Sequence, residues 1–378
     1  MSDAIGIYLH IPFCRQKCRY CDFPSYAGME AKQEAYVTAL TEEIKRYGKE
    51  LDGQEVHSVF LGGGTPTVLP LPLLERLMAA VFDCFSVSAD AEITTEANPG
   101  TLDREKVRGL RNMGFHRISM GVQAWQNRHL QKLGRIHTIE EFLENYHALR
   151  EAGFSNLNVD LMFALPEQTM ADWQETLEKI TELEPEHISA YSLILEEGTP
   201  FYEEWQKGRL PMVSEELDRE MYRWAVEFLA KKGYEQYEIS NFAKAGYQSR
   251  HNRIYWQAEE YLGLGLGAHS YWRGVRFHNT YDLQAYLAKA GKDAVAERET
   301  VTPQDALEEF MFLGLRLTEG ISFRRFRERF GKEMKGVYGE QIKRLKTEGL
   351  LEETERGIRL SGRGIDVSNL VFQEFLLD

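Results

Sequence analysis

Three of the four cysteines in this chain lie within eight positions, in the segment HIPFCRQKCRYCDFPSY that begins at His10. These are Cys14, Cys18 and Cys21. Three closely spaced thiolates can hold three irons of a four-iron, four-sulfur cluster and leave the fourth iron without a protein ligand. A vacant iron can bind and polarise a small molecule, whereas a cluster held by four cysteines mainly transfers electrons. The spacing therefore predicts a [4Fe-4S] cluster with an open site.

A zinc site made from the three cysteines and His10 is the alternative. Structural zinc usually joins two ligand pairs that are distant in sequence. The remaining cysteine, Cys84, ends an apolar helix-like stretch, where a thiol is more often a small buried side chain. Four cysteines, three of them within eight positions, do not make a disulfide framework either. The pattern thus favours the iron-sulfur interpretation.

Short apolar, β-branched runs alternate with longer amphipathic stretches from residue 5 to about residue 240. Strands that are apolar on both faces and separated by helices indicate parallel βαβ units. Six units predict an α/β fold with an incomplete (β/α)6 barrel, in which the chemistry lies at the C-terminal ends of the strands. The expected strands cover residues 5–11, 56–62, 91–97, 116–122, 156–165 and 187–194. The expected helices lie near residues 31–50, 71–84, 103–113, 138–152, 169–183 and 214–232.

Candidate ligand residues follow the ends of these strands. Gly62-Gly63-Gly64-Thr65-Pro66 comes directly after the second strand, and its glycines would let a ligand approach exposed N-H groups. The same glycines would also suit a tight turn between strand and helix. Each further candidate could be a solvated polar residue, but their regular placement predicts one pocket. These candidates are Glu96, Gln123, Arg135 and Asp160.

The pattern changes after residue 240. Residues 241–300 are rich in glycine and aromatic residues and hold the motif His251-Asn252-x-x-Tyr255-Trp256, and the polar residues 291–306 predict a linker. Residues 301–378 predict a mainly helical domain that ends in a pair of strands, as in a winged helix. Its basic residues are interleaved with Glu, which favours a domain packed on the barrel over a nucleic-acid reader. The expected domains are residues 1–240, 241–300 and 301–378.

Composition limits the classes of partner. The chain of 378 residues carries a formal net charge of -14, which disfavours electrostatic capture of nucleic acid. The first residues lack the basic and apolar regions of a signal peptide, and no run of about 18 apolar residues occurs. The sequence therefore predicts a cytoplasmic protein and leaves transient membrane contact and a homodimer open.

The motifs HIPFCxxxCxYC, GGGTPT, TxExNP, SMGVQ and DLMxxLPxQT, in this order, resemble those of a radical S-adenosylmethionine (SAM) family. This family comprises the oxygen-independent coproporphyrinogen III oxidases and their relatives, and the resemblance covers nearly the whole chain. It implies a [4Fe-4S] cluster that binds and cleaves SAM. It also implies that SAM is held by Tyr8, Tyr20, Gly63, Gly64, Thr65, Glu96, Gln123, Arg135, Asp160 and the backbone near Ile194.

Two differences between this sequence and the oxidases indicate which branch of the family it resembles. The oxidases carry a further cysteine where this chain has Phe23, and a long N-terminal arm where this chain reaches its first strand by residue 5. Both features resemble the haem chaperone HemW branch, whose members bind haem and pass it to acceptors such as respiratory haem proteins. The resemblance thus implies a haem carrier, with no catalytic residue assigned. An oxidase that decarboxylates coproporphyrinogen III stays the alternative. A zinc-stabilised winged-helix binder would need a basic face that the sequence does not show.

The HNxxYW motif also resembles that branch, which implies haem binding at His251, Asn252, Tyr255 and Trp256. An exposed imidazole suits haem iron as an axial ligand, and neighbouring aromatic side chains suit the flat macrocycle. We therefore expect an exposed His251 that ligates the iron. His10, His269 and His278 are rival ligands.

Overall fold

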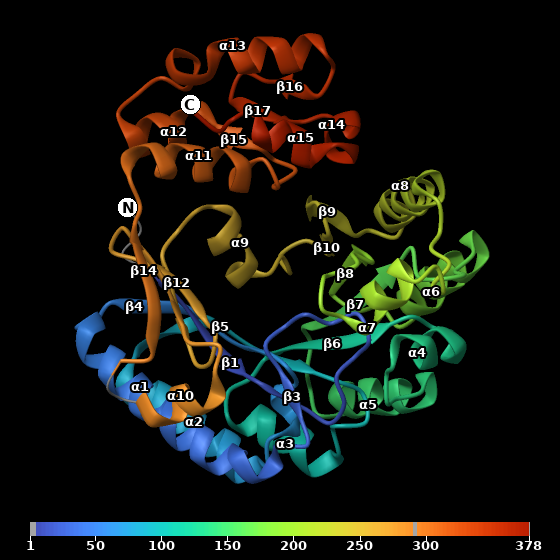
Figure 1. Ribbon diagram of the computed structural model, residues 1–378, viewed down its shortest axis with the longest axis vertical. Coiled ribbons are helices and arrows are strands. Elements are labelled where there is room, and N and C mark those ends of the chain that lie inside the picture. The colour runs from blue at the N-terminus through green and yellow to red at the C-terminus, as the bar shows by residue number, and fades with distance from the viewer. Residues whose placement is uncertain (1–4, 290–292, 378) are drawn as a thin grey trace.

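An incomplete barrel forms the centre of the computed structural model, which describes residues 5–289 and 293–377 (Figure 1). Its wall consists of six neighbouring parallel strands, and helices follow them along the chain. The expected (β/α)6 barrel is confirmed. In sheet order the strands are β1 (Ile5–Ile11), β4 (Glu55–Gly63), β5 (Ser86–Ala97), β6 (Arg117–Gln123), β7 (Leu157–Phe163) and β8 (His187–Ser192).

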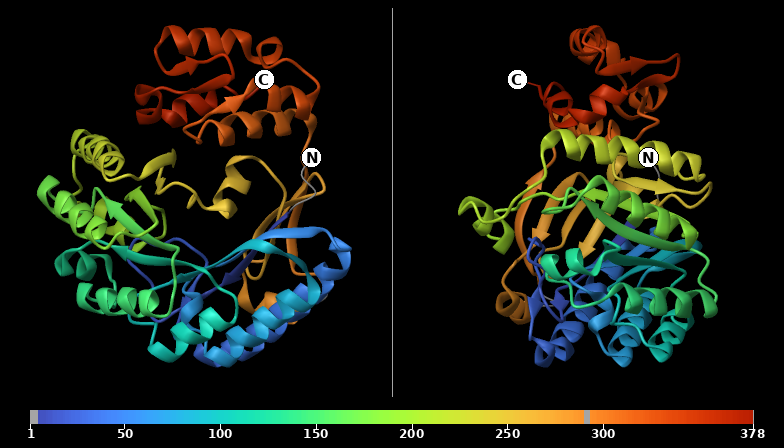
Figure 2. Two further views of the ribbon diagram at one scale, coloured as in Figure 1. Left: turned by 180° about the vertical axis from the view of Figure 1, so that it is seen from behind. Right: turned by 90° about the vertical axis from the view of Figure 1, so that its right-hand side faces the viewer.

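Amphipathic helices cover the outside of this wall (Figure 2). Several begin at side-chain caps that satisfy free backbone N-H groups, such as the capping boxes at Thr138 and Thr169. The six expected helices are α1 (Gln33–Leu51), α2 (Leu71–Cys84), α3 (Arg104–Asn112), α5 (Ile139–Glu151), α6 (Met170–Glu182) and α8 (Glu215–Lys231). Two short helices were not expected, namely α4 (Asn127–Leu133) and α7 (Pro200–Gln206).

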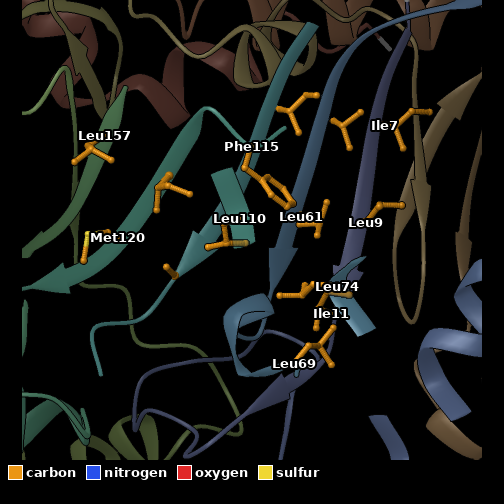
Figure 3. Close-up of a cluster of buried hydrophobic side chains, with 14 of the residues drawn as sticks. Ile7, Leu9, Ile11, Leu61, Leu69, Leu74, Leu110, Phe115, Met120 and Leu157 are labelled. Carbon is orange, nitrogen blue, oxygen red and sulfur yellow. The ribbon is translucent and has the colours of Figure 1, made fainter. Parts of the chain in front are cut away.

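The two faces of the wall differ in polarity. Apolar side chains such as Ile7, Leu9, Leu61 and Met120 belong to the buried core, part of which Figure 3 shows. The alternate positions of the same strands hold polar groups that line the barrel interior, among them Ser119. The expectation of strands that are apolar on both faces is therefore wrong. An incomplete barrel that encloses a polar cavity needs a polar inner face.

The sheet continues beyond the barrel on both sides. At one edge β11 (Tyr261–Leu264) pairs parallel with β1 and is followed by antiparallel strands; at the other edge β8 pairs with β10. The added strands are β9 (Glu235–Glu238), β10 (Asn241–Ala243), β12 (His269–Trp272), β13 (Val275–Asn279) and β14 (Val295–Thr300). Two short helices complete this part, α9 (Arg250–Trp256) and α10 (Leu283–Lys289).

The linker expected over residues 291–306 is wrong for most of that stretch. Residues 295–300 form the edge strand β14, and the next helix begins at Pro303. Residues 291 and 292 lie outside the described part of the chain. The β14 backbone pairs with β13 while most of its side chains are exposed, so a polar sequence is compatible with a strand here.

The C-terminal residues form a mainly helical unit beside the barrel, with its own buried apolar cluster and a hairpin (Figure 2). The mainly helical, winged-helix-like character is confirmed. Its helices are α11 (Pro303–Gly314), α12 (Phe323–Phe330), α13 (Met334–Thr347), α14 (Gly362–Asp366) and α15 (Ser368–Gln373). Its strands are β15 (Ile321–Ser322), β16 (Leu351–Glu353) and β17 (Gly357–Leu360). Within residues 5–289 and 293–377, no helix has the length and apolar character that crossing a membrane requires.

A buried carboxylate ties α1 to the strands added beside β1. Glu43 is 2% exposed and accepts hydrogen bonds from the Gly265 N-H at 3.0 Å, Asn279 Nδ2 at 2.7 Å and the Tyr286 hydroxyl at 2.6 Å. Burial raises the pKa of the Glu43 carboxyl. Three donors from separate segments thus depend on one acceptor group.

We expect Glu43→Ala to lower the thermal unfolding midpoint clearly, because each buried donor left without a partner costs about 1–3 kcal/mol. The matched control is Glu42→Ala, which removes an exposed carboxylate paired with Lys45 and should change the midpoint little. Equal midpoints for the two variants in calorimetry would contradict this role for Glu43.

Candidate functional site

The cysteine loop leaves the barrel at the C-terminal end of β1. It begins at β2 (Phe13–Cys14) and returns at β3 (Tyr26–Ala27), which pairs parallel with β2. All three cysteines are partly buried free thiols. Burial raises the pKa of Cys14, and it raises the pKa of Cys21 to about 11. Metal binding at this loop must therefore displace protons from the thiols.

These thiols face a cavity of about 350 Å³ at the C-terminal ends of the barrel strands. We call it the first cavity. Eleven sequence-predicted residues line it: Cys14, Cys18, Tyr20, Cys21, Gly63, Gly64, Thr65, Glu96, Gln123, Arg135 and Asp160. It is also lined by Gln16, Lys17, Phe23, Ser25, Ala97, Asn98, Ser119, Gly121, Met162 and Tyr191. The structure thus brings all three cysteines and most of the predicted SAM residues together.

A chain of partly buried hydrogen bonds joins two of the cysteines along the wall of this cavity. Arg135 Nη1 donates to Cys18 Sγ at 3.5 Å, and Arg135 Nη2 donates to Asn98 Oδ1 at 2.7 Å. Asn98 Nδ2 donates to Thr65 Oγ1 at 2.9 Å, and that hydroxyl donates to Cys14 Sγ at 3.7 Å. Donors aimed at two sulfur atoms suit thiolates that carry negative charge.

Two glycines after β4 let the backbone approach the cysteine loop closely. A Cβ atom on Gly64 would lie 2.7 Å from the Phe13 carbonyl oxygen and 3.0 Å from Cys14 Sγ. Gly63 has a φ of +110°, and a Cβ atom there would lie 2.4 Å from the His10 ring. This segment therefore needs glycine for contact as well as for the turn.

Gln123 ends β6 in a backbone conformation that side chains rarely adopt. Its φ is +73°, and the pairing of β6 with β7 shifts register between Gly121 and Gln123. Backbone strain of this kind concentrates at ligand-binding positions. The side chain is 9% exposed and lines the first cavity.

Two buried carboxylates lie in the wall of the first cavity. Burial, reinforced by the charge of Asp160, raises the pKa of Glu96 to about 8, although Glu96 Oε2 accepts the Gly63 N-H at 3.0 Å. Burial also raises the pKa of Asp160, whose carboxylate accepts hydrogen bonds from Ser119 Oγ at 2.9 Å and Asn158 Nδ2 at 2.7 Å. The pair can bind a cation or several hydroxyl groups.

His10 does not complete a zinc site with the cysteines. Its Nε2 lies 2.8 Å from the Pro24 carbonyl oxygen, and its Nδ1 lies 3.0 Å from the Tyr8 hydroxyl. Among the described residues, no three His, Cys, Asp or Glu side chains converge closely enough to ligate a single metal ion. The geometry fits a larger cluster, in which each thiolate binds a separate iron.

A second cavity of about 360 Å³ adjoins the first and shares Phe23, Gly63 and Glu96 with it. Its wall is mostly aromatic and includes the predicted residues Tyr8 and Tyr255. The remaining lining residues are His10, Pro24, Tyr261, Gly267, Ala268, His269 and Tyr281. Tyr8 therefore faces this cavity, although its SAM role was expected in the first.

His251 is buried and lies on α9, which Figure 1 shows between the barrel and the C-terminal helices. It is 1% exposed, with Nδ1 2.8 Å from Ser58 Oγ and Nε2 2.7 Å from the Tyr255 hydroxyl. Burial lowers the pKa of His251 to about 3. The expectation of an exposed imidazole is therefore wrong, because the Glu92 carboxylate binds the N-H groups at the start of α9 and holds the helix against the barrel strands.

Three further predicted residues, like His251, lie apart from both cavities. Asn252 is on α9 with its backbone N-H capped by Ser249, and Trp256 lines a separate cavity against the C-terminal helices. Ile194 follows β8 and is 67% exposed. None of the three is among the described residues that line the first or the second cavity.

Some residues of the first cavity were not assigned from the sequence. Asn98 stands in the TTEANP motif, so a signal was present, but its link between Arg135 and Thr65 depends on three separate loops. Ser119 follows the alternation of β6 and binds Asp160. Tyr191 lies near the end of β8, where the apolar run gave no sign of a cavity residue.

Comparison with known proteins places these features in a family. The radical SAM superfamily matches residues 8–180, and the HemN C-terminal domain matches residues 301–367. The haem chaperone HemW of Lactococcus lactis is 38% identical over 98% of this chain and 97% of its own length. HemW of Bacillus subtilis is 39% identical over 98% of each chain. The crystal structure of coproporphyrinogen III oxidase from Escherichia coli, a radical SAM enzyme, superposes with a TM-score of 0.85 over 98% of this chain and 90% of that chain, at 23% identity.

We expect Cys14→Ala, Cys18→Ala and Cys21→Ala each to abolish the broad near-visible absorbance of an iron-sulfur cluster after anaerobic reconstitution. Cys84→Ala is the matched control, since Cys84 ends α2 and does not line the first cavity. It should keep the absorbance and the iron content. A colourless wild-type protein with tightly bound zinc would contradict the cluster.

We also expect the affinity for SAM to rise with pH and to level off above about pH 8. SAM carries positive charge, so it favours ionised Glu96, whose pKa is about 8 in the protein alone. Below that pH, binding must expel a proton, and the affinity should change by at most about tenfold per pH unit. Calorimetric titrations of the cluster-loaded protein between pH 6 and 9 measure this dependence. Glu96→Gln should flatten it, and an unchanged slope in that variant would contradict the role of Glu96.

Proposed function

The chain belongs to the HemW family of the radical SAM superfamily, and we propose from this premise that it is a haem chaperone. It would bind haem and pass it to acceptor haem proteins, while carrying a [4Fe-4S] cluster and SAM. The observation that carries the proposal is the similarity to proteins named haem chaperone HemW over almost the full length of both chains. The alternative, oxidation of coproporphyrinogen III, has the solved oxidase in its favour, but that likeness concerns the fold.

The residues of the first cavity fit the cluster and SAM. Cys14, Cys18 and Cys21 would hold the cluster, which when bound supplies an electron and an open iron for SAM. Arg135 donates to Cys18 and would compensate part of the added negative charge. The carboxylates of Glu96 and Asp160 would orient the polar groups of SAM. The N-H groups of Gly63, Gly64 and Thr65 already donate within the protein, so this turn would contribute space for SAM.

The presence of Phe23 favours the haem-carrier function over the oxidase function. Its side chain is 60% exposed and lines both cavities, so it lies where the first cavity opens into the second. The oxidases, which this chain otherwise resembles, have a cysteine at this position of the motif. An aromatic side chain offers a flat apolar surface for a macrocycle and cannot supply a thiol.

The HNxxYW segment would contribute to the haem site through Tyr255. The imidazole of His251 and the ring of Tyr255 lie edge to face with centroids 5.0 Å apart, so His251 positions an aromatic wall of the second cavity. Direct ligation by His251 stays a prediction. It would require loss of the hydrogen bonds to Ser58 and Tyr255, whereas Asn252 and Trp256 would act through the packing of α9.

We also propose that the transfer of haem to acceptor proteins takes place in the cytoplasm. Acceptors would be haem proteins such as respiratory enzymes, with transient membrane contact where the acceptor is membrane-bound. A homodimer is compatible with the proposal but is not required by it. Nucleic acid is not a proposed partner, because the formal net charge is -14.

A single preparation can test the two functions together. The reconstituted protein is titrated with haem and, in parallel, incubated anaerobically with coproporphyrinogen III, SAM and a reductant. We expect saturable haem binding near one equivalent and no protoporphyrinogen above the background of the Cys18→Ala variant. Rapid formation of protoporphyrinogen would contradict the haem-carrier function, and so would a failure of the protein to bind haem.

A further inference from the structure

The lining of the second cavity has the chemistry of a site for a flat, largely apolar ring. Tyr8, Tyr255 and Tyr261 line one part of it, and the exposed rings of Phe23 and Tyr281 stand at its rim. Aromatic side chains stack well on a macrocycle. With a volume of about 360 Å³ the cavity would enclose only part of a haem, which leaves the remainder accessible to an acceptor.

Two histidines line this cavity, and only one is available to an iron atom. His10 is 5% exposed, and both of its ring nitrogens lie within hydrogen-bond distance of Tyr8 or Pro24. His269 is exposed and has one hydrogen bond among the described residues, from Nε2 to the Tyr281 hydroxyl at 2.7 Å. Its Nδ1 has no hydrogen-bond partner among the described residues, and either imidazole nitrogen can ligate iron.

The surroundings of His269 hold its ring in place. His269 and His278 occupy paired positions on β12 and β13, and their rings stack with centroids 4.9 Å apart. The Tyr281 backbone carbonyl accepts a hydrogen bond from the Tyr26 hydroxyl at 3.1 Å. A ligand histidine is usually oriented in this way by a hydrogen bond at its second nitrogen.

The remaining candidate for the iron ligand, His278, already has a hydrogen-bond partner at each ring nitrogen. Its Nδ1 lies 2.9 Å from the Asn279 carbonyl oxygen and its Nε2 lies 3.3 Å from Glu297 Oε2. It is also not among the described residues that line the second cavity. Burial, and then the charges of His278 and Arg276, lower the pKa of His269, so its imidazole is neutral near pH 7 and has a lone pair for iron.

We propose that haem binds in the second cavity with His269 as the axial ligand of the iron and Tyr281 as the residue that positions the imidazole. This inference rests on the proposed haem-carrier function and assigns its ligand to β12, rather than to the HNxxYW motif. No Lys or Arg of the described chain lines the cavity, so the two propionates extend into solvent. A haem bound at one edge, through one exposed histidine, can leave without unfolding of the barrel.

The test compares His269→Ala with His251→Ala, each loaded with ferric haem. The measurements are haem affinity by titration, and the axial-ligand signature in absorption and electron paramagnetic resonance spectra. We expect His269→Ala to weaken haem binding at least tenfold and to lose the wild-type signature, and added imidazole to restore the signature. His251→Ala should keep the signature. His57→Ala, which removes a half-exposed imidazole on β4, is the control for adventitious binding by surface histidines.

Each outcome bears on the proposal. The proposal would be overturned if His269→Ala kept the wild-type signature and affinity. It would also be overturned if Tyr281→Phe lost the signature while His269→Ala kept it, because the iron ligand would then be the Tyr281 phenol oxygen. Loss of the signature in His251→Ala alone would return the ligand to the HNxxYW motif. Absence of haem binding by the wild-type protein would instead overturn the haem-carrier function itself. Intact cluster absorbance in every variant shows that the barrel has folded.

Discussion

The buried guanidinium of Arg135 is the interaction on which the arrangement of the first cavity depends. It donates to Cys18 Sγ on the cysteine loop, to Asn98 after β5 and to the Gly121 carbonyl oxygen in β6. A fixed, planar cation with several donors can hold three loops in one geometry, which a flexible ammonium cannot do as well. Burying that charge is costly unless its donors are satisfied, so the loops are constrained to supply acceptors. Cys18 directly, and Cys14 through Asn98 and Thr65, are thus oriented by these polar contacts.

Polar and charged groups also line the inner face of the barrel outside the first cavity. Arg117 is 2% exposed, and its charge lowers the pKa of His187 and His251 after the larger effect of burial. Neutral imidazoles can accept and donate, and His187 bridges Asn158 and Tyr237 at 2.5 and 2.8 Å. The hydrogen bonds of His251 to Ser58 and Tyr255 satisfy the imidazole on α9, whereas the buried Trp256 indole N-H has no partner among the described residues. The HNxxYW helix is therefore a structural part of the barrel as well as a wall of the second cavity.

Much of this could be predicted from the sequence, because parallel βαβ units carry local signals. Strand β1 begins and ends where the apolar run does, and Glu96, Gln123 and Asp160 follow from the rule that barrel chemistry lies near strand C-termini. The burial of His251 could not be predicted, since it depends on the Glu92 carboxylate, 159 positions away in the chain, binding the start of α9. Strand β14 was missed for a different reason: an edge strand exposes its side chains, so its sequence resembles a polar linker although it pairs with the preceding strand β13.

The two cavities share the side chain of Glu96. Burial, reinforced by the charge of Asp160, raises the pKa of Glu96 to about 8. A cation bound in the first cavity would favour ionisation of Glu96, which would place a negative charge in the wall of the second cavity. In the proposed haem site, that charge would repel the propionates of the ring and favour their placement toward the open rim that holds His269 and Tyr281. Binding free energies are reciprocal, so any effect of a cation in the first cavity on the affinity for the ring would be matched by an equal effect of the ring on the affinity for the cation.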